Sequence, residues 1–138
     1  MYLFRAISRD EYELLRSGKS IRSDRDFSIY YRGTTTKGLS FFKVDSINDD
    51  EIFVKDCDRM NVRLAVNIDT LLQRVPGYSK YAYNVILEVP DDFGNKSHGS
   101  YVLSRETVVA PERWSSFYNM NMVKRIIERG TEKVVYSK

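Results

Sequence analysis

Cysteine and histidine occur only once each in this chain of 138 residues, as Cys57 and His98. A lone cysteine excludes an internal disulfide and favours a reducing compartment. A lone histidine excludes the histidine-rich metal sites. Cys57 is flanked by Asp56 and Asp58, but without a second thiol or a nearby histidine these residues do not make a zinc site. We therefore expect no bound metal.

Long apolar runs are also missing. The longest, such as VILEV, are far too short to cross a bilayer, and no charged segment followed by an apolar stretch and a cleavage site is found near residue 1. We expect no membrane span, no secretory signal and a cytoplasmic location. The chain also has no Ser-His-Asp set, no P-loop and no Gly-x-Gly-x-x-Gly motif, so the common nucleotide and hydrolase signatures are excluded.

The composition is that of an ordinary globular domain. Hydrophobic residues make up 42% of the chain and charged residues 30%, which is typical of a folded protein rather than a disordered one. A length of 138 residues predicts one domain, 1–138, with its own core. The net charge of +3 permits contact with an anionic partner but does not require one.

The first 18 residues predict a strand, a tight turn and a capped helix. Residues 2–7 are mostly apolar or aromatic, which indicates a strand. Ser8 and Glu11 form the S-x-x-E capping box that opens a helix, and Gly18 is placed to end that helix in the left-handed conformation.

Arg5 lies inside that first strand. An arginine in a half-buried strand is unfavourable unless it is paired or holds an anion. Glu11 and Asp10 are the nearest acidic partners in sequence, so Arg5 is either half of a local ion pair or a ligand-binding residue. The residues alone leave both interpretations open.

Strand-like segments outnumber helix-like segments in the rest of the chain. Strands are predicted at 39–44, 62–68, 83–89, 100–103, 106–110 and 133–136, and helices at 46–58, 70–75 and 115–129. The two kinds do not alternate as in a doubly wound sheet. We therefore predict an α+β fold: a single domain with a mixed, mainly antiparallel sheet and flanking helices.

Three short motifs occur in a particular order: LFRAIS before the capped helix, then KGLSFF, then SRETVV. This order resembles the ADP-ribosyltransferase superfamily, and more narrowly its small toxin-type and phage-type members with an arginine, a serine and a glutamate. By position, Arg5 matches the arginine of the first strand, Ser40 the serine of the second, and Glu106 the late glutamate. The resemblance spans roughly residues 2–110 and implies an ADP-ribosyltransferase-like fold.

The resemblance implies NAD as the substrate, with no metal. When nicotinamide leaves NAD, the ribose becomes cationic, and Glu106 is expected to stabilise that charge. Arg5 is expected to hold a phosphate or an oxygen on the adenosine side through a bidentate contact, and Ser40 to brace the site by hydrogen bonding. Phe41 or Phe42 is expected to form a wall for the nicotinamide ring.

Two features depart from the family pattern. The position two residues before the glutamate is Ser104, where the arginine-specific branch has a second glutamate, so arginine is a less favoured acceptor. YYRGT also looks like the first-strand motif, which makes Arg32 a competitor for the family arginine and a candidate cofactor-binding residue. Its short distance from KGLSFF leaves no room for the intervening helix, so we favour Arg5.

The function expected from the resemblance is mono-ADP-ribosyl transfer to a protein or nucleic acid, as a toxin or an anti-defence effector. The alternative is a non-catalytic binding or inhibitor protein, either an inactive member of that fold or an unrelated α+β module. The oligomeric state stays open. A third possibility is a nucleic-acid binder whose affinity falls steeply with salt. Its basic residues would be Arg16, Lys19, Arg22, Arg25, Arg32 and Lys37.

Overall fold

The computed structural model describes the chain except for residues 24–28, 31–36, 48–50, 57–62 and 76. The described elements are strands joined by short helical pieces. In chain order they are β1 (Tyr2–Ser8), α1 (Arg9–Arg16), β2 (Ile21–Arg22), β3 (Ile29–Tyr30), β4 (Lys37–Val44), β5 (Glu51–Asp56), β6 (Arg63–Asn67), α2 (Ile68–Leu72), η1 (Tyr78–Lys80), β7 (Tyr81–Glu88), β8 (Asn95–Leu103), β9 (Glu106–Ser115), β10 (Phe117–Tyr118), η2 (Met120–Met122), β11 (Val123–Glu128) and β12 (Val134–Ser137).

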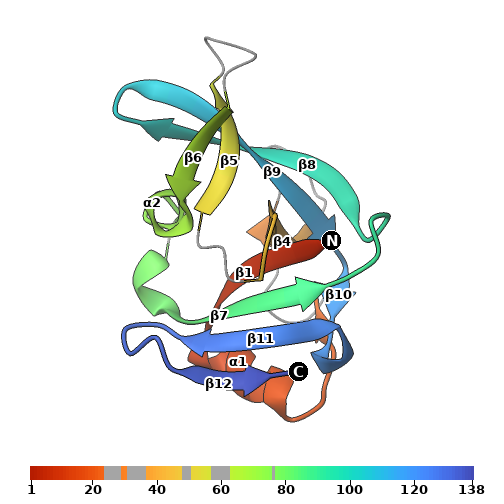
Figure 1. The fold of residues 1–138 in the computed structure, drawn as a ribbon. Helices are drawn as coiled ribbons and strands as arrows, with labels where there is room; N and C mark the ends of the chain where they lie inside the picture. The colour runs from red at the N-terminus through yellow and green to blue at the C-terminus, as the bar shows by residue number, and fades with distance from the viewer. Residues whose placement is uncertain (24–28, 31–36, 48–50, 57–62, 76) are drawn as a thin grey trace.

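One large antiparallel sheet dominates the molecule and curls into a half-barrel (Figure 1). Its strand order is β12-β11-β7-β1-β4-β9-β5-β6, with β3 added to β4 and β8 added to β9. β10 and β2 form a separate two-stranded sheet. β9 has two partners on one edge, because β4 pairs with its later half and β5 with its earlier half, while β8 runs along its other edge.

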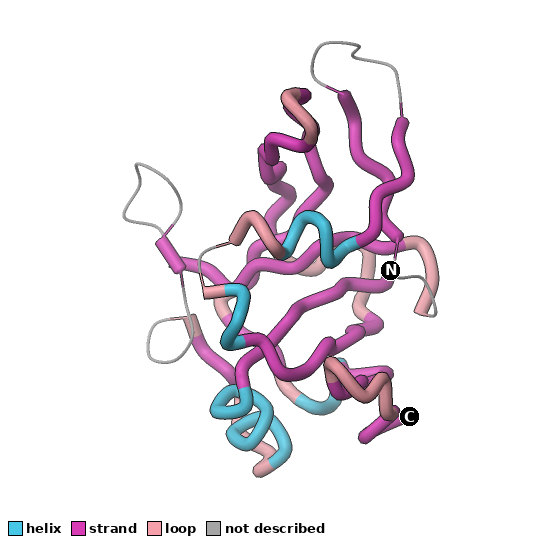
Figure 2. The backbone as a smooth tube through the Cα atoms, turned by 90° about the vertical axis from the view of Figure 1, so that its left-hand side faces the viewer, coloured by secondary structure: helices cyan, strands magenta, loops and turns pink. Residues whose placement is uncertain are grey.

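The expected α+β fold with flanking helices is wrong: the described part of the chain is mostly β. Figure 2 shows how little of the tube is helical. Where a helix was expected over 46–58, the structure has β5, in which Ile52 and Val54 are buried and Phe53 is 41% exposed. That alternation has the period of two of a strand.

The expected helix over 115–129 is replaced by β10, η2 and β11. The pairing of β11 with β7 shifts register between Val123 and Arg125. Such a bulge inserts one extra residue and so moves the following side chains to the other face. Val123 and Ile126 therefore both point into the core, and their spacing of three imitates that of a helix.

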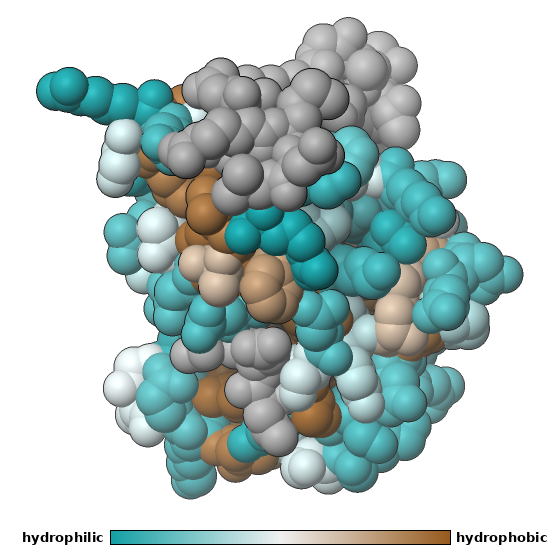
Figure 3. All heavy atoms as spheres, turned by 45° about the horizontal axis from the view of Figure 1, so that its top comes forward, coloured by the Kyte–Doolittle hydropathy of each residue, from teal (hydrophilic) through white to brown (hydrophobic). Residues whose placement is uncertain are grey.

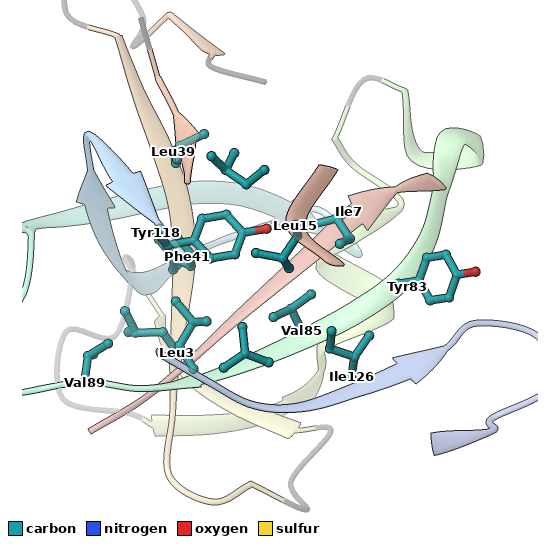
Figure 4. Close-up of a cluster of buried hydrophobic side chains, with 13 residues drawn as sticks. Leu3, Ile7, Leu15, Leu39, Phe41, Tyr83, Val85, Val89, Tyr118 and Ile126 are labelled. Carbon is teal, nitrogen blue, oxygen red and sulfur yellow. The ribbon is translucent and has the colours of Figure 1, made fainter. Parts of the chain in front are cut away.

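The central strands of the sheet are buried on both faces, with a separate hydrophobic core on each. Leu3 and Ile7 of β1 belong to a first core with α1, β7, β10 and β11, drawn in Figure 4. Phe4 and Ala6 belong to a second core with β4, β5, α2 and β9. Because successive strand residues point to opposite faces, β1 must be apolar on both, which explains its near-continuous apolar sequence.

The sequence prediction for α1 is confirmed. The Ser8 side chain accepts a hydrogen bond from the backbone N–H of Glu11 at 3.2 Å. Gly18 follows the helix with φ +90°, the left-handed conformation that favours glycine. The helix buries Glu11 and Leu15 against the first core and is seen at the bottom of Figure 1, behind β11 and β12.

Candidate functional site

Arg5 lies where β1 and β4 cease to pair. The two strands are paired only over Tyr2–Phe4 and Phe42–Val44. Beyond Phe4, the Arg5 Nη1 donates to the backbone carbonyl of Ser40 at 3.2 Å. The side chain thus satisfies a carbonyl that is not part of the β1–β4 pairing.

The Arg5 guanidinium forms a bidentate ion pair with Glu11. Its Nε and Nη2 atoms each lie 2.8 Å from a different carboxylate oxygen. The side chains are 11% and 2% exposed. Burial alone would lower the pKa of Arg5, but the charge and hydrogen bonds of Glu11 outweigh it, so the pKa is raised above its usual value.

Tyr118 of β10 extends the buried ion pair into a network of three side chains. Its hydroxyl donates to the Glu11 Oε2 at 2.5 Å, and its side chain is fully buried. Burial, followed by the negative charge of Glu11, raises the pKa of Tyr118 well above its usual value. The Arg5–Glu11–Tyr118 network joins β1, α1 and β10, and the charge of Arg5 is neutralised within the protein.

The structure places the side chains of Arg5 and Ser40 on opposite faces of the sheet. Arg5 is on the face of Leu3 and Ile7, whereas Ser40 pairs with Trp114 on the face of Phe42. The Arg5 side chain contacts Ser40 at its backbone carbonyl.

The two candidate phenylalanines are divided in the same way. Phe41 packs in the first core, where the Arg5 guanidinium lies 5.7 Å from its ring centroid. Phe42 packs in the second core. Only one of them therefore shares a face with Ser40, and Arg32 lies outside the described residues.

Glu106 is far from the other predicted site residues. It is the first residue of β9 and pairs with Leu103 across the turn formed by Ser104 and Arg105. Ser40 pairs with Trp114, eight residues further along β9. At roughly 3.3 Å per residue, this is about 26 Å along the strand. The structure therefore does not bring Arg5, Ser40 and Glu106 into one site.

A different glutamate, Glu112, lies close to Ser40 on the same face. It pairs with Phe42 and is 6% exposed. The Tyr101 hydroxyl donates to the Glu112 Oε1 at 2.8 Å, and the Tyr101 ring lies 6.0 Å from that of Phe42. Gly99 makes room for this arrangement, because a Cβ there would be 2.2 Å from the Glu112 Oε1.

Burial raises the pKa of Glu112 above its usual value, although the Tyr101 hydroxyl and the Trp114 side chain act in the opposite direction by stabilising the charged form. Burial, and then the charge of Glu112, raise the pKa of Tyr101 as well. A partly desolvated carboxyl beside aromatic side chains can act as an acid or base or stabilise a nearby cation. No clear signal in the sequence pointed to Glu112, because the strand was predicted only over 106–110 and Glu112 follows Pro111; the structure extends β9 to Ser115.

A cavity of about 420 Å³ lies elsewhere, near Met1, Glu88 and Val123, and none of the predicted site residues lines it. The lysines at its wall already have partners: Lys124 pairs with Glu88 at 3.5 Å, and Lys138 donates to a backbone carbonyl. Volume alone does not make this cavity a catalytic site, so the chemistry points to Glu112 instead.

The described residues contain no group of three or more His, Cys, Asp or Glu side chains that could hold a metal ion. In the same part of the chain, no helix is both long and apolar enough to cross a membrane. No protein-family model, curated protein or solved structure matches the chain.

Proposed function

We propose that the protein is a NAD-dependent mono-ADP-ribosyltransferase in which Glu112, rather than Glu106, supplies the carboxylate. The observation that supports this proposal is the environment of Glu112. Its carboxyl is almost fully buried, is hydrogen-bonded to Tyr101 and shares a face with Phe42 and Ser40. Carboxyl groups with perturbed pKa values are enriched in active sites.

The proposed reaction breaks the bond between nicotinamide and C1′ of the ribose. Nicotinamide leaves with the bonding electron pair, and positive charge develops on the sugar. Ionised Glu112 stabilises that charge, and the Tyr101 hydroxyl holds the carboxylate in place. An acceptor nucleophile then bonds to C1′ and loses its proton. Trp114, which is half-buried and two residues from Glu112 on β9, supplies aromatic surface for the nicotinamide ring, and Phe42 packs beside the carboxylate from the core.

Arg5 has no direct part in this proposal. Its guanidinium is neutralised by Glu11, and it lies on the other face of the sheet. The acceptor is a protein or a nucleic acid, which fits an effector that acts on a competing cell or a defence system. We place the reaction in the cytoplasm, since a chain with a single cysteine suits a reducing compartment.

The test is consumption of labelled NAD by the purified protein in cell lysate, followed by detection of ADP-ribose on macromolecules. Glu112→Gln is expected to reduce transfer by about 100-fold or more, the usual effect of removing one preorganised electrostatic group. Glu106→Gln is the matched control and is expected to keep wild-type activity. Circular dichroism and NAD binding by calorimetry should be the same for both variants.

Loss of transfer in Glu106→Gln with retention in Glu112→Gln would overturn the assignment of the carboxylate. Release of free nicotinamide without transfer would indicate a glycohydrolase. If the wild-type protein neither binds nor consumes NAD, the enzymatic proposal is wrong.

A second candidate function is a non-catalytic binding protein. This candidate is favoured because the structure does not bring Arg5, Ser40 and Glu106 into one site. It is also favoured because Glu11 neutralises the charge of Arg5. A binding protein would be indifferent to Glu112→Gln. It would also form a stable complex with a partner protein in the absence of NAD, which affinity purification followed by size-exclusion chromatography can measure.

A further inference from the structure

The outward face of the sheet formed by β5, β6, β8 and β9 carries an exposed aromatic ring among basic side chains. In β5, Ile52 and Val54 are buried, so Phe53 and Lys55 point outward. Arg63 of β6 pairs with Lys55, and its guanidinium lies 4.5 Å from the centroid of the Phe53 ring. We call the set of Phe53, Lys55, Arg63 and Lys96 the basic sheet face.

Lys55 and Arg63 are direct cross-strand neighbours of like charge. Such pairs destabilise a sheet, because the side chains repel each other at close range. Within the described part of the chain, neither side chain forms an ion pair with a carboxylate. An anion bound between them would relieve the repulsion.

The same face continues across β9 onto β8. Lys55 pairs with Val109, which pairs with Ser100, so four strands contribute to one row. Side chains two residues to either side of Ser100 share its face, and the alternation continues to Lys96. Across the strands, the row spans about 14 Å.

Exposed apolar groups lie on the same face as the charges. Val102 of β8 is 60% exposed and Phe53 is 41% exposed. Seen from the end of the molecule where these strands lie, the surface is mainly hydrophilic with hydrophobic patches (Figure 3). An exposed surface that combines an aromatic ring with cations is suited to bases and phosphates at the same time.

We propose that the basic sheet face binds single-stranded nucleic acid without sequence preference. Lys55 and Arg63, which are cross-strand neighbours, contact neighbouring phosphates. Lys96, four residues from Ser100 and so about 13 Å further along β8, contacts a more distant phosphate of the same strand, and a base stacks on Phe53 or on the Arg63 guanidinium above it. The exposed aromatic ring favours a nucleic acid over an acidic protein segment, because a carboxylate partner has no use for a stacking surface. This proposal is independent of the reaction proposed for Glu112, which lies on the other face.

The test uses a fluorescein-labelled oligothymidine of about 12 nucleotides, within the usual range of site sizes. Fluorescence anisotropy gives the affinity at several salt concentrations. Three phosphate contacts predict a slope of log K against log salt of about −2, at roughly −0.7 per contact on a single strand. Lys55→Gln is expected to make this slope shallower by about 0.7.

Phe53→Ala is expected to lower the affinity by roughly 5- to 140-fold while leaving the salt slope unchanged, because stacking releases no counterions. Phe117→Ala is the matched control, since Phe117 is 40% exposed but belongs to β10. Lys80→Gln, an exposed lysine of η1, is the control for charge. Circular dichroism establishes that each variant is folded.

The proposal is overturned if the wild-type protein does not bind the oligonucleotide, or if Phe53→Ala and Phe117→Ala bind equally well. It is also overturned if polyglutamate of the same length competes as strongly as unlabelled oligothymidine, which would indicate an acidic protein partner. A salt slope that Lys55→Gln and Lys80→Gln change to the same extent would show diffuse attraction instead of a defined site.

Discussion

Replacing Glu11 by leucine is expected to destabilise the protein severely. The change leaves the Arg5 guanidinium, 11% exposed, without its carboxylate and the buried Tyr118 hydroxyl without its acceptor. Breaking a buried ion pair by removing one partner lowers the free energy of unfolding by about 3–5 kcal/mol. Since the whole stability of a domain is about 5–15 kcal/mol, this loss is a large fraction of it.

The other members of the network give graded effects. Tyr118→Phe removes the hydrogen bond to Glu11 and the polar contact with Arg5 but leaves the ion pair in place, so a loss of about 1.5–3 kcal/mol is expected. Arg5→Met leaves the Glu11 carboxylate buried and removes a donor from the Ser40 carbonyl, with an expected loss of about 3–5 kcal/mol.

The double variant Arg5→Met, Glu11→Leu removes both charges together. Apolar replacement of a whole buried pair is often neutral or stabilising. The double variant is therefore expected to be more stable than either single variant, so the single losses do not add.

Urea denaturation followed by tryptophan fluorescence and circular dichroism measures these four unfolding free energies. Single variants that each lose less than about 1 kcal/mol, or losses that simply add in the double variant, would refute the network as a structural unit. Arg5 would then be available for a ligand, as the motif LFRAIS first suggested.

Two other changes test the region around β9. Folding raises the pKa of Glu112 above its usual value of 4.5, so the folded protein binds this proton more tightly than the unfolded chain does. The free energy of unfolding therefore falls as pH rises from about 4.5 through the raised pKa of the folded state. Urea denaturation across a pH series should show that Glu112→Gln lacks this fall, and a pH profile identical to that of the wild type would contradict it. Ser104 and Arg105 have φ +49° and +72°, which are strained for residues other than glycine and asparagine. Replacing them by Asn-Gly should raise the free energy of unfolding, measured by urea denaturation, by about 1 kcal/mol. An unchanged or lower value would contradict a tight turn of this type.

The elements that depend on local chemistry could be predicted from the sequence. The capping signal at Ser8 and the stop at Gly18 define α1, because each acts through hydrogen bonds and torsions within a few residues. The apolar run over 83–89 correctly indicated an interior strand, β7, which lies between β1 and β11.

The candidate site could not be predicted in the same way, because the order of motifs along a chain does not say which face of a sheet each side chain occupies. A shift of one residue moves every side chain to the opposite face. Arg5 and Ser40 are neighbours through the backbone of adjacent strands, yet their side chains are separated by the sheet. Pairing Ser40 with Trp114 also brings Glu112 close and leaves Glu106 at the far end of β9.

The position of β1 in the middle of the sheet has a consequence for synthesis of the chain. β1 pairs with β4 on one side and with β7 on the other, and β7 is complete only at Glu88. At about 5–20 residues per second, a ribosome adds the intervening 80 or so residues in roughly 4 to 16 s. During that interval, β1 lacks the β7 strand that covers one of its edges, and its apolar side chains on both faces lack their neighbours from β7. Chaperone binding to ribosome-bound chains should therefore be strongest for chains that end before β7.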